Sequence, residues 1–399
     1  MMAKNEVDRC KSYLNRVLQM DVEFTPSMLY DIAPVSGSFM REALLRLGNP
    51  RKTLDKMHEL INRLCDDIKR RCDLVAIDKS ASPPLYLNET YSLMLDRWEK
   101  INKDFYRVKD AQYDLTKVPE VYDMARYDVL HNYHLEIDFL EDLFRLAELF
   151  ADCVVPQEYG VDETEKRGIG VKMCSALMSK IQYDLNVAKS GTQMDMEYLL
   201  DLSHGDDLRI RTLGRSVRTR LYFTSESHLY TLLNVLTYPP HGQKSVFSDE
   251  GREVIDRLKE LSYLSQISIR LFDKRSRSTD DPLKYRCEIS FSPGATGDPT
   301  VDKTGGLADR VLLNKSIPCD DLISCLTYAL SESEGTRSAS TDGGANSLAS
   351  ADYIVRGLSP SLSATPSHGE NRSRIVLTTP GTTPTKRSQF DDINSAHNF

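Results

Sequence analysis

A histidine preceded by hydroxyl and arginine residues is the strongest chemical feature of this sequence. His228 follows the run TSES, and five arginines precede that run, at positions 209, 211, 215, 218 and 220. An imidazole exchanges protons near neutral pH, and the planar guanidinium group of arginine binds phosphate oxygens in a bidentate way. We therefore predict a phosphate site that contains His228, Arg218, Arg220, Ser225 and Ser227.

The residues around His228 predict a strand that runs directly into a helix. Residues 217–225 alternate between two sets of side chains and include β-branched and aromatic residues, as strands do. Leucines at 229, 232, 233 and 236 then recur at helical spacing. A helix N-terminus offers free N–H groups and a positive dipole end, and hydroxyl residues cap it. A histidine here can also be satisfied by its neighbours alone, and that alternative stays open.

Six runs of sequence resemble one known family. The run VRTRLYFTSESHLYTLL resembles the phosphatase-like domain of the inositol hexakisphosphate and diphosphoinositol-pentakisphosphate kinases, which belongs to the histidine acid phosphatase superfamily. Further runs resemble the same family in the same order over residues 1–297: RKTLDKMHELINRL, YSLMLDRWEKINKDF, YDLTKVPEVYDMARYDVLHN, VVPQEYG and EISFSPGATG. Ordered matches of this kind are more specific than one short motif.

The resemblance implies a site made of two parts. In histidine acid phosphatases, an RHGxRxP-like motif supplies the nucleophilic histidine and phosphate-binding arginines, and a second histidine contacts the phosphate. His228 matches that second histidine by resemblance. The residue after it, often a carboxylate proton donor in the family, is Leu229 here and cannot donate a proton. Either Glu226 replaces it or the acid lies elsewhere; Glu158, in the run VVPQEYG, is a further candidate by resemblance alone.

Two family features are missing from residues 1–399. No histidine follows an arginine, so the chain contains no RH[GA]xR motif. The ATP-grasp kinase region, which would use ATP with magnesium, is also missing, and we expect no cofactor in this chain. We therefore expect a C-terminal part of a family member, an isoform or a partial gene model, that is inactive alone. Its family ligand would be an inositol polyphosphate or pyrophosphate.

Two other functions remain open at this point. One is a non-catalytic module that binds inositol polyphosphates and regulates a partner. The other is a helical interaction protein without a ligand site. Binding of inositol hexakisphosphate that is lost in Arg218→Ala or Arg220→Ala would distinguish the first of these from the second.

Composition excludes several classes of protein. The formal net charge of −8 disfavours a general nucleic-acid binder. The eight cysteines form no CxxC pair, which suits reduced thiols in a cytosolic protein and gives no zinc pattern. No apolar run approaches the ~18 residues of a membrane span. We therefore expect a cytoplasmic protein without a membrane span.

The predicted fold is α/β: a partial histidine acid phosphatase-like fold with a small sheet and a large helical insert. Residues 1–200 are predicted to be mostly helical and 201–330 to bear the sheet. The clearest helical patterns cover 4–19, 54–68, 89–107, 118–131, 138–153 and 163–187, and the strands are predicted near 217–225, 265–273 and 284–292. Trp98 is predicted to pack in the core, and His131 and His134 are not spaced to bind a metal on one helix face.

Residues 331–399 are predicted to be a disordered tail. They are rich in Ser, Thr, Gly and Asn and poor in large apolar residues, so they cannot bury enough surface to offset chain entropy. Ser359, Thr365, Thr379 and Thr383 each precede a proline. These dipeptides make proline-directed kinases possible partners of the tail.

Overall fold

The computed structural model describes residues 3–32, 39–190, 219–240, 243–274, 278, 281–296, 298–301 and 306–338. All of them lie in one compact unit, Met1–Ser350. None of the helices in these ranges is both long enough and apolar enough to cross a bilayer.

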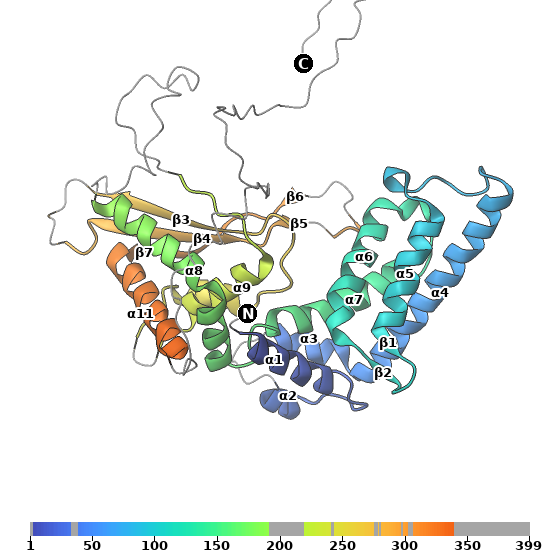
Figure 1. The fold of residues 1–399 in the computed structure, drawn as a ribbon, viewed down its shortest axis with the longest axis horizontal. Coiled ribbons are helices and arrows are strands. Elements are labelled where there is room, and N and C mark those ends of the chain that lie inside the picture. Colours follow the sequence, from blue (N-terminus) through green and yellow to red (C-terminus); the bar gives the residue numbers. More distant parts are fainter. Residues whose placement is uncertain are drawn as a thin grey trace, which may run out of the picture. The chain divides into compact units, whose positions relative to one another are not determined.

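The predicted helical part is present and begins the chain (Figure 1). Its helices are α1 (Lys4–Val17), α2 (Pro26–Ile32), α3 (Phe39–Leu47), α4 (Pro50–Ile77), α5 (Tyr91–Phe105), α6 (Val118–His131) and α7 (Leu140–Val154). Short connections between them include η1 (Tyr86–Asn88), the strand pair β1 (Tyr106–Arg107) and β2 (Gln112–Tyr113), η2 (Leu115–Lys117), η3 (Tyr133–Leu135) and η4 (Val155–Gln157). Each predicted helical stripe supplies buried residues to a shared core.

Capping and burial explain where these helices begin and how they pack. The Asn49 side chain accepts a hydrogen bond from the Lys52 amide at the start of α4, and Thr90 does the same for Leu93 in α5. Trp98 of α5 is fully buried, as predicted. Its indole N–H also donates to Asp128 of α6 at 2.7 Å, so Trp98 joins two helices by a hydrogen bond as well as by packing.

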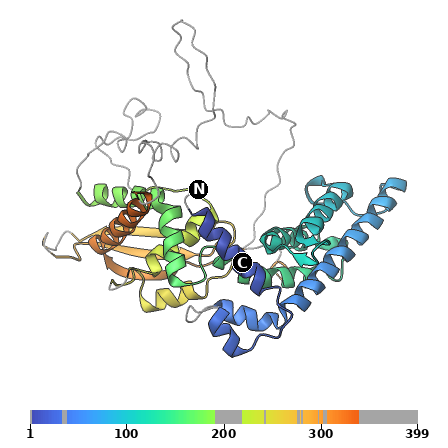
Figure 2. The ribbon, with the colours of Figure 1, turned by 60° about the horizontal axis from the view of Figure 1, so that its bottom comes forward.

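A layer of helices and a sheet follow the helical part. The helices are α8 (Glu163–Ser190), α9 (Glu226–Thr237), α10 (Asp249–Asp256) and α11 (Cys319–Ser338). The antiparallel sheet has the order β3-β4-β7, with β3 (Gln266–Asp273), β4 (Tyr285–Ser292) and β7 (Val311–Pro318). A short pair, β5 (Ala295–Thr296) and β6 (Gly306–Leu307), lies between β4 and β7 in the chain. Helices α8 and α11 pack side by side along the sheet (Figure 2).

Two of the three predicted strands are confirmed as β3 and β4, and the register between these two strands is continuous. Ile269 of β3 pairs with Ile289 of β4, and Cys287 of β4 pairs with Ile317 of β7. Strand β7 and helix α11 were not predicted. Since α11 runs to Ser338, it also extends past residue 331, where the predicted tail begins. The tail from residue 339 onward lies outside the described residues.

The third predicted strand, 217–225, is wrong for the residues that the structure describes there. Residues 219–225 form neither strand nor helix, and no strand pairs with them. Leu221 and Phe223 are 74% and 89% exposed, so the apolar members of the alternating pattern bury no face. A period of two predicts a strand only where a neighbour supplies hydrogen bonds and cover, and this segment has neither.

Candidate functional site

His228 lies in the first turn of α9, where the predicted helix begins. Ser225 is the N-cap residue, with extended backbone angles of φ −78° and ψ 159°, and its carbonyl accepts the His228 amide at 3.1 Å. The following turns of α9 are buried through Tyr230, Leu233 and Leu236. This burial against α8 fixes the helix, and therefore the place of His228 at its end.

The predicted hydroxyl residues bind the imidazole ring instead of capping the helix. The Thr224 hydroxyl lies 2.6 Å from Nδ1 of His228, and the Ser225 hydroxyl lies 3.2 Å from the same nitrogen. The Ser225 and Ser227 hydroxyls are 2.8 Å apart. His228, Ser225 and Ser227 are therefore brought together as predicted, and Thr224 joins them.

This arrangement decides which ring nitrogen is left for chemistry. Because Nδ1 is engaged by hydroxyls, Nε2 is the nitrogen through which His228 can meet a ligand. Nε2 has no hydrogen-bond partner within the described part of the chain. A ring held in this way can donate to, or accept a proton from, a phosphate oxygen without first reorienting.

Within the described residues, the arginine of the predicted phosphate site is held by a carboxylate. Arg220 makes an ion pair with Asp184 of α8 at 3.1 Å, and both side chains are largely buried. Tyr222 also donates a hydrogen bond to Asp184. The described charge partner of Arg220 is therefore a carboxylate of its own chain, which Lys180 also approaches at 3.6 Å. Arg218 lies outside the described residues, as do the three arginines before it.

Glu226 lies two residues before His228, at the start of α9, and its pKa is near neutral pH. The residue is exposed overall, but protein groups packed around its carboxylate displace water, and this desolvation raises its pKa to about 7. The charges of Asp123 and Glu158 add to the shift. A carboxyl group that titrates near neutral pH can donate a proton at that pH. Glu226 thus has the acidity that the predicted role requires.

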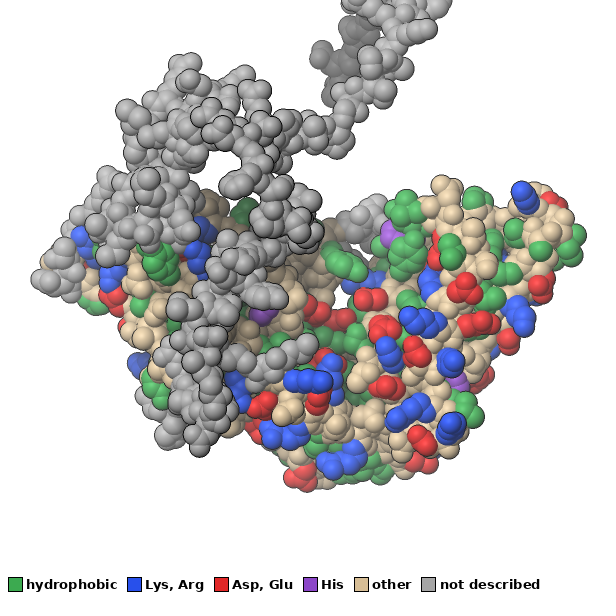
Figure 3. Space-filling model, viewed as in Figure 1, with side chains coloured by type: hydrophobic (Ala, Val, Ile, Leu, Met, Phe, Trp, Pro, Cys, Tyr) green, Lys and Arg blue, Asp and Glu red, His purple; other side chains and the backbone are tan. Residues whose placement is uncertain are grey.

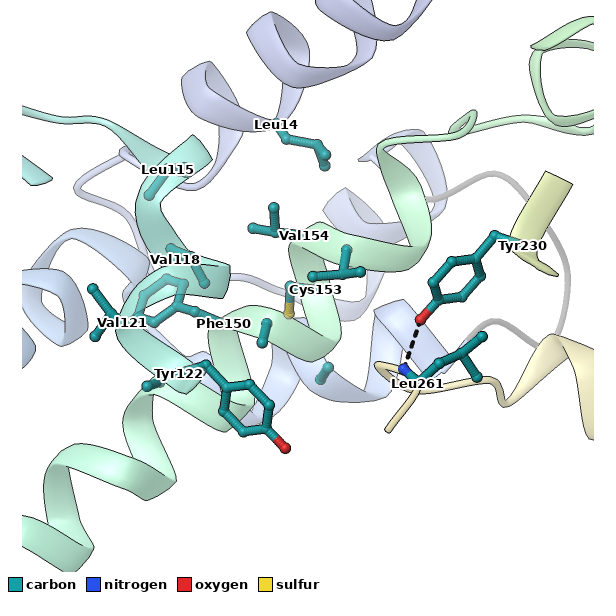
Figure 4. Packing of buried hydrophobic residues seen from close by; sticks show 14 of the residues in the cluster. Leu14, Leu115, Val118, Val121, Tyr122, Phe150, Cys153, Val154, Tyr230 and Leu261 are labelled. Atoms are coloured by element: carbon teal, nitrogen blue, oxygen red, sulfur yellow. Dashed lines mark hydrogen bonds between the residues drawn. The ribbon is translucent and has the colours of Figure 1, made fainter. Parts of the chain in front are cut away.

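Tyr230 links the N-terminal part of α9 by hydrogen bonds to the segment before β3. Its hydroxyl donates to the carbonyl of Lys259 at 2.8 Å and accepts the Leu261 amide at 3.0 Å. Figure 4 shows the second of these bonds, with Phe150, Cys153 and Val154 of the helical core close by. Because both bonds are made to backbone groups, residues 259–261 are held beside α9.

The hydrogen bonds of Tyr230 bring a group of carboxyls close to Glu226. Burial raises the pKa of Asp123 in α6 and of Glu158 after η4, and it raises the pKa of Glu260 to about 9, with help from the charges of Asp123 and Glu226. Glu158 makes an ion pair with Lys11 at 3.0 Å. The charges of Asp123 and Glu158 raise the pKa of Glu226, and those of Asp123 and Glu226 raise the pKa of Glu260, so these carboxyls share one region. The surroundings of Glu226 are therefore acidic, not basic as the arginine run predicted.

Sequence reasoning singled out Glu226 and Glu158 separately as candidate acids, but it did not predict that they lie near Asp123 and Glu260. These carboxyls come from four separate segments of the chain, and each alone is an ordinary carboxylate in a helix or loop. On the face drawn in Figure 3, basic and acidic side chains are interspersed over the described residues of α4 to α7. No group of three His, Cys, Asp or Glu side chains in the described residues is arranged to hold a metal ion.

The other histidines that the sequence singled out have local partners. The His131 ring stacks on Tyr86, with ring centroids 4.0 Å apart and planes at 9°. Nε2 of His134 lies 2.9 Å from the carbonyl of Pro84. Both rings join α6 or η3 to the loop before α5, which is a structural role.

Comparison with known proteins places these elements in a family. The family model described as the histidine phosphatase superfamily (branch 2) matches residues 42–291. The chain is 36% identical over 292 residues to inositol hexakisphosphate and diphosphoinositol-pentakisphosphate kinase 2 of Homo sapiens, which covers 72% of this chain and 23% of the human protein. It is 35% identical over 282 residues to the kinase VIP1 of Arabidopsis thaliana, covering 58% of this chain and 27% of that protein. The chain thus spans about a quarter of these relatives. No solved structure gives a significant match.

Proposed function

The chain belongs to the histidine phosphatase superfamily, and from that premise we propose that it is the His228-bearing part of a phosphatase-like domain from an inositol pyrophosphate kinase. Relatives with a similar sequence are named as kinases of inositol hexakisphosphate and diphosphoinositol-pentakisphosphate. The ligand class that we propose for His228 is therefore a phosphate group of an inositol polyphosphate or pyrophosphate. We further propose that this chain alone hydrolyses neither.

One observation carries the first part of the proposal. The Thr224 hydroxyl, 2.6 Å from Nδ1, orients the His228 ring at the N-terminus of α9 and leaves Nε2 for a ligand. Free amide groups of the first helical turn favour an anion at the same place. Glu226, with its pKa near 7, is a proton donor in the same turn, and its carboxyl is hydrogen-bonded towards Tyr230 and Leu261. Together these groups suit contact with a phosphate and protonation of its leaving oxygen.

The second part of the proposal rests on the groups that hydrolysis needs besides these. A covalent mechanism needs a nucleophile, and no histidine of this chain follows an arginine as the family's nucleophile does. Loss of the nucleophile costs about 10⁴-fold or more in rate in other covalent hydrolases. Arg220 is ion-paired with Asp184, which competes with a polyanion for its charge. The proposal assigns no cofactor to this chain; ATP and magnesium would serve the kinase reaction named for the relatives.

The rival proposal is a non-catalytic module that binds inositol polyphosphates. The hydroxyl-bound His228 favours it, and the carboxyls around Glu226 oppose it, since they offer a polyanion no positive charge. Whether the isolated chain binds such a ligand therefore decides between the two proposals.

Two measurements on the purified chain separate the proposals. Phosphate release from inositol hexakisphosphate and from its diphospho product is compared between the wild-type chain and His228→Ala. We expect no difference above background, and turnover that disappears in His228→Ala would overturn the inactivity claim. His134→Ala is the matched control, because the described contacts of the His134 ring are with the Pro84 carbonyl and the Tyr133 ring, away from α9.

Titration calorimetry with inositol hexakisphosphate tests the module. Binding in the micromolar range that is lost in both His228→Ala and Arg220→Ala, and retained in His134→Ala, would favour the module. Heat signals equal to dilution at millimolar ligand would exclude it and leave the inactive phosphatase part.

A further inference from the structure

Two buried cysteines meet where the sheet joins the last described helix. Cys287 lies within β4, and Cys319 is the first residue of α11. Both are fully buried. Cys287 pairs across the sheet with Ile317, so Cys319 lies two residues further along the neighbouring chain segment. Side chains at that diagonal offset lie on the same face and within reach of each other.

The two thiols are in direct contact through a hydrogen bond between their side chains. That bond holds the pKa of Cys319 below its usual value and, together with burial, raises the pKa of Cys287. The charge of the neighbouring Asp320 opposes the Cys319 thiolate, and that of Lys189 of α8, which is ion-paired with Asp320, favours it. A position at a helix N-terminus favours a thiolate for the same electrostatic reason. Cys319 is thus the attacking sulfur of the pair and Cys287 its partner.

We propose that Cys287 and Cys319 form a reversible disulfide, a redox modification site that joins β4 to α11. With hydrogen peroxide as oxidant, the Cys319 thiolate attacks one peroxide oxygen and forms a sulfenic acid, and the displaced oxygen leaves as water. The Cys287 sulfur then attacks the sulfenic sulfur, its proton leaves with the hydroxyl group as a second water, and the disulfide forms. Two thiols are oxidised and one peroxide is reduced to two waters.

Oxidant reaches the pair from the side of the first turn of α11. Ser316, Asp320 and Asp321, which flank Cys319, are exposed, so the cysteine lies directly beneath the surface. Opening of this one turn uncovers it without unfolding the sheet. Cys72 and the other thiols differ in this respect, since no second cysteine contacts them in the described residues.

The disulfide would restrict the helices that pack towards α9, whose first turn carries His228. Helix α11 packs along α8, and α8 packs along α9, whose first turn carries His228. A covalent bond between β4 and the start of α11 restricts movement of α11 against the sheet. The oxidised protein should therefore unfold at a higher temperature than the reduced protein.

Thiol counting and peptide mapping test the proposal on the full chain. The reduced protein is treated with hydrogen peroxide under native conditions, and free thiols are then counted in denaturant. The wild-type count should fall from eight to six and return to eight after dithiothreitol. Trypsin releases Cys287 in a peptide that ends at Lys303, but it leaves Cys319 and Cys325 together in residues 316–337. Mapping is therefore done in Cys325→Ser, where a linked pair can contain only Cys287 and Cys319.

Variants separate this pair from general oxidation. In Cys319→Ser and Cys287→Ser, seven thiols should remain before and after peroxide, and the rise in melting temperature should vanish. In Cys72→Ser, two of the seven thiols should still be lost, and the rise should persist. A wild-type count that stays at eight, thiol loss only in denaturant, or a linked peptide that joins other cysteines would each overturn the proposal. The wild-type count and the Cys325→Ser map decide the matter even if a serine variant fails to fold.

Discussion

Arg220 is ion-paired with Asp184 of α8, with Nε and Oδ1 3.1 Å apart. Asp184 also accepts a hydrogen bond from Tyr222, so one buried carboxylate fastens two residues of the segment before α9. That segment has no strand partner among the described residues. Asp184 therefore holds two residues of the segment that leads the chain to His228.

Replacement of Asp184 should release this segment. In Asp184→Ala, Arg220 and Tyr222 lose their shared acceptor, which should cost about 1–3 kcal/mol in the free energy of unfolding. Trypsin should also cleave after Arg220 faster than in the wild-type chain. Urea denaturation and mass spectrometry of timed digests measure the two effects. The exposed Asp138→Ala is the control; equal cleavage rates in all three proteins would show that Asp184 does not anchor the segment.

A second buried carboxylate is predicted to determine the stability of the helical part. Asp128 of α6 is fully buried and accepts hydrogen bonds from Arg97 at 2.6 and 2.9 Å, from Trp98 and from Asn132. In Asp128→Ala, the guanidinium of Arg97 and the indole of Trp98 lose this partner, and we expect a loss of roughly 3–5 kcal/mol. Asp128→Asn keeps the acceptor oxygen and should lose less. The free energy of unfolding in urea measures both, and equal losses would contradict the expectation that the retained acceptor oxygen stabilises the fold.

The stability of the fold should decline as pH rises from about 4 towards 9. Burial raises the pKa of Glu260 to about 9, whereas a glutamate in the unfolded chain has a pKa of about 4.3. Between these values the unfolded state binds fewer protons than the folded state, so the free energy of unfolding falls with rising pH. Glu226, with its pKa raised to about 7, acts in the same direction up to that pH.

Glu260→Gln tests this pH dependence. Glutamine is neutral at every pH, so the variant should lose less stability than the wild-type chain between pH 5.5 and pH 8.5. Urea midpoints at the two pH values measure the difference, with the exposed Glu59→Gln of α4 as control. If the variant and the wild type decline in parallel, Glu260 does not keep its proton in the folded state.

The hydroxyl of Thr224 should set the protonation pattern of the His228 ring. Thr224→Val keeps the shape but removes the group 2.6 Å from Nδ1, so the balance between the two neutral ring tautomers should shift. Nitrogen chemical shifts of the ring in a ¹⁵N-histidine-labelled protein report that balance directly. Thr224→Ser restores a hydroxyl and should return the shifts to wild-type values. Identical shifts in Thr224→Val would show that Ser225 alone orients the ring.

Most of the helices and two of the strands could be predicted because each has its own pattern of apolar residues. The α4 stripe of Leu54, Met57, Ile61 and Leu64 buries one face, whichever element covers it. Capping is equally local: Ser248 accepts the Gly251 amide at 3.1 Å at the start of α10. The family resemblance, which rests on runs of residues, was confirmed for the same reason.

Only the tertiary structure decided what the residues around His228 face. The sequence by itself determined that a helix begins at this histidine and that hydroxyl residues precede it. It could not show that Asp184, 36 positions earlier, pairs with Arg220, nor that Glu260 lies near Glu226. Charge pairing and desolvation depend on which groups the fold brings within a few ångströms, whereas periodicity and capping depend on neighbours in the chain. The helices and their caps could therefore be predicted from the sequence, whereas the electrostatics of the site depend on tertiary packing.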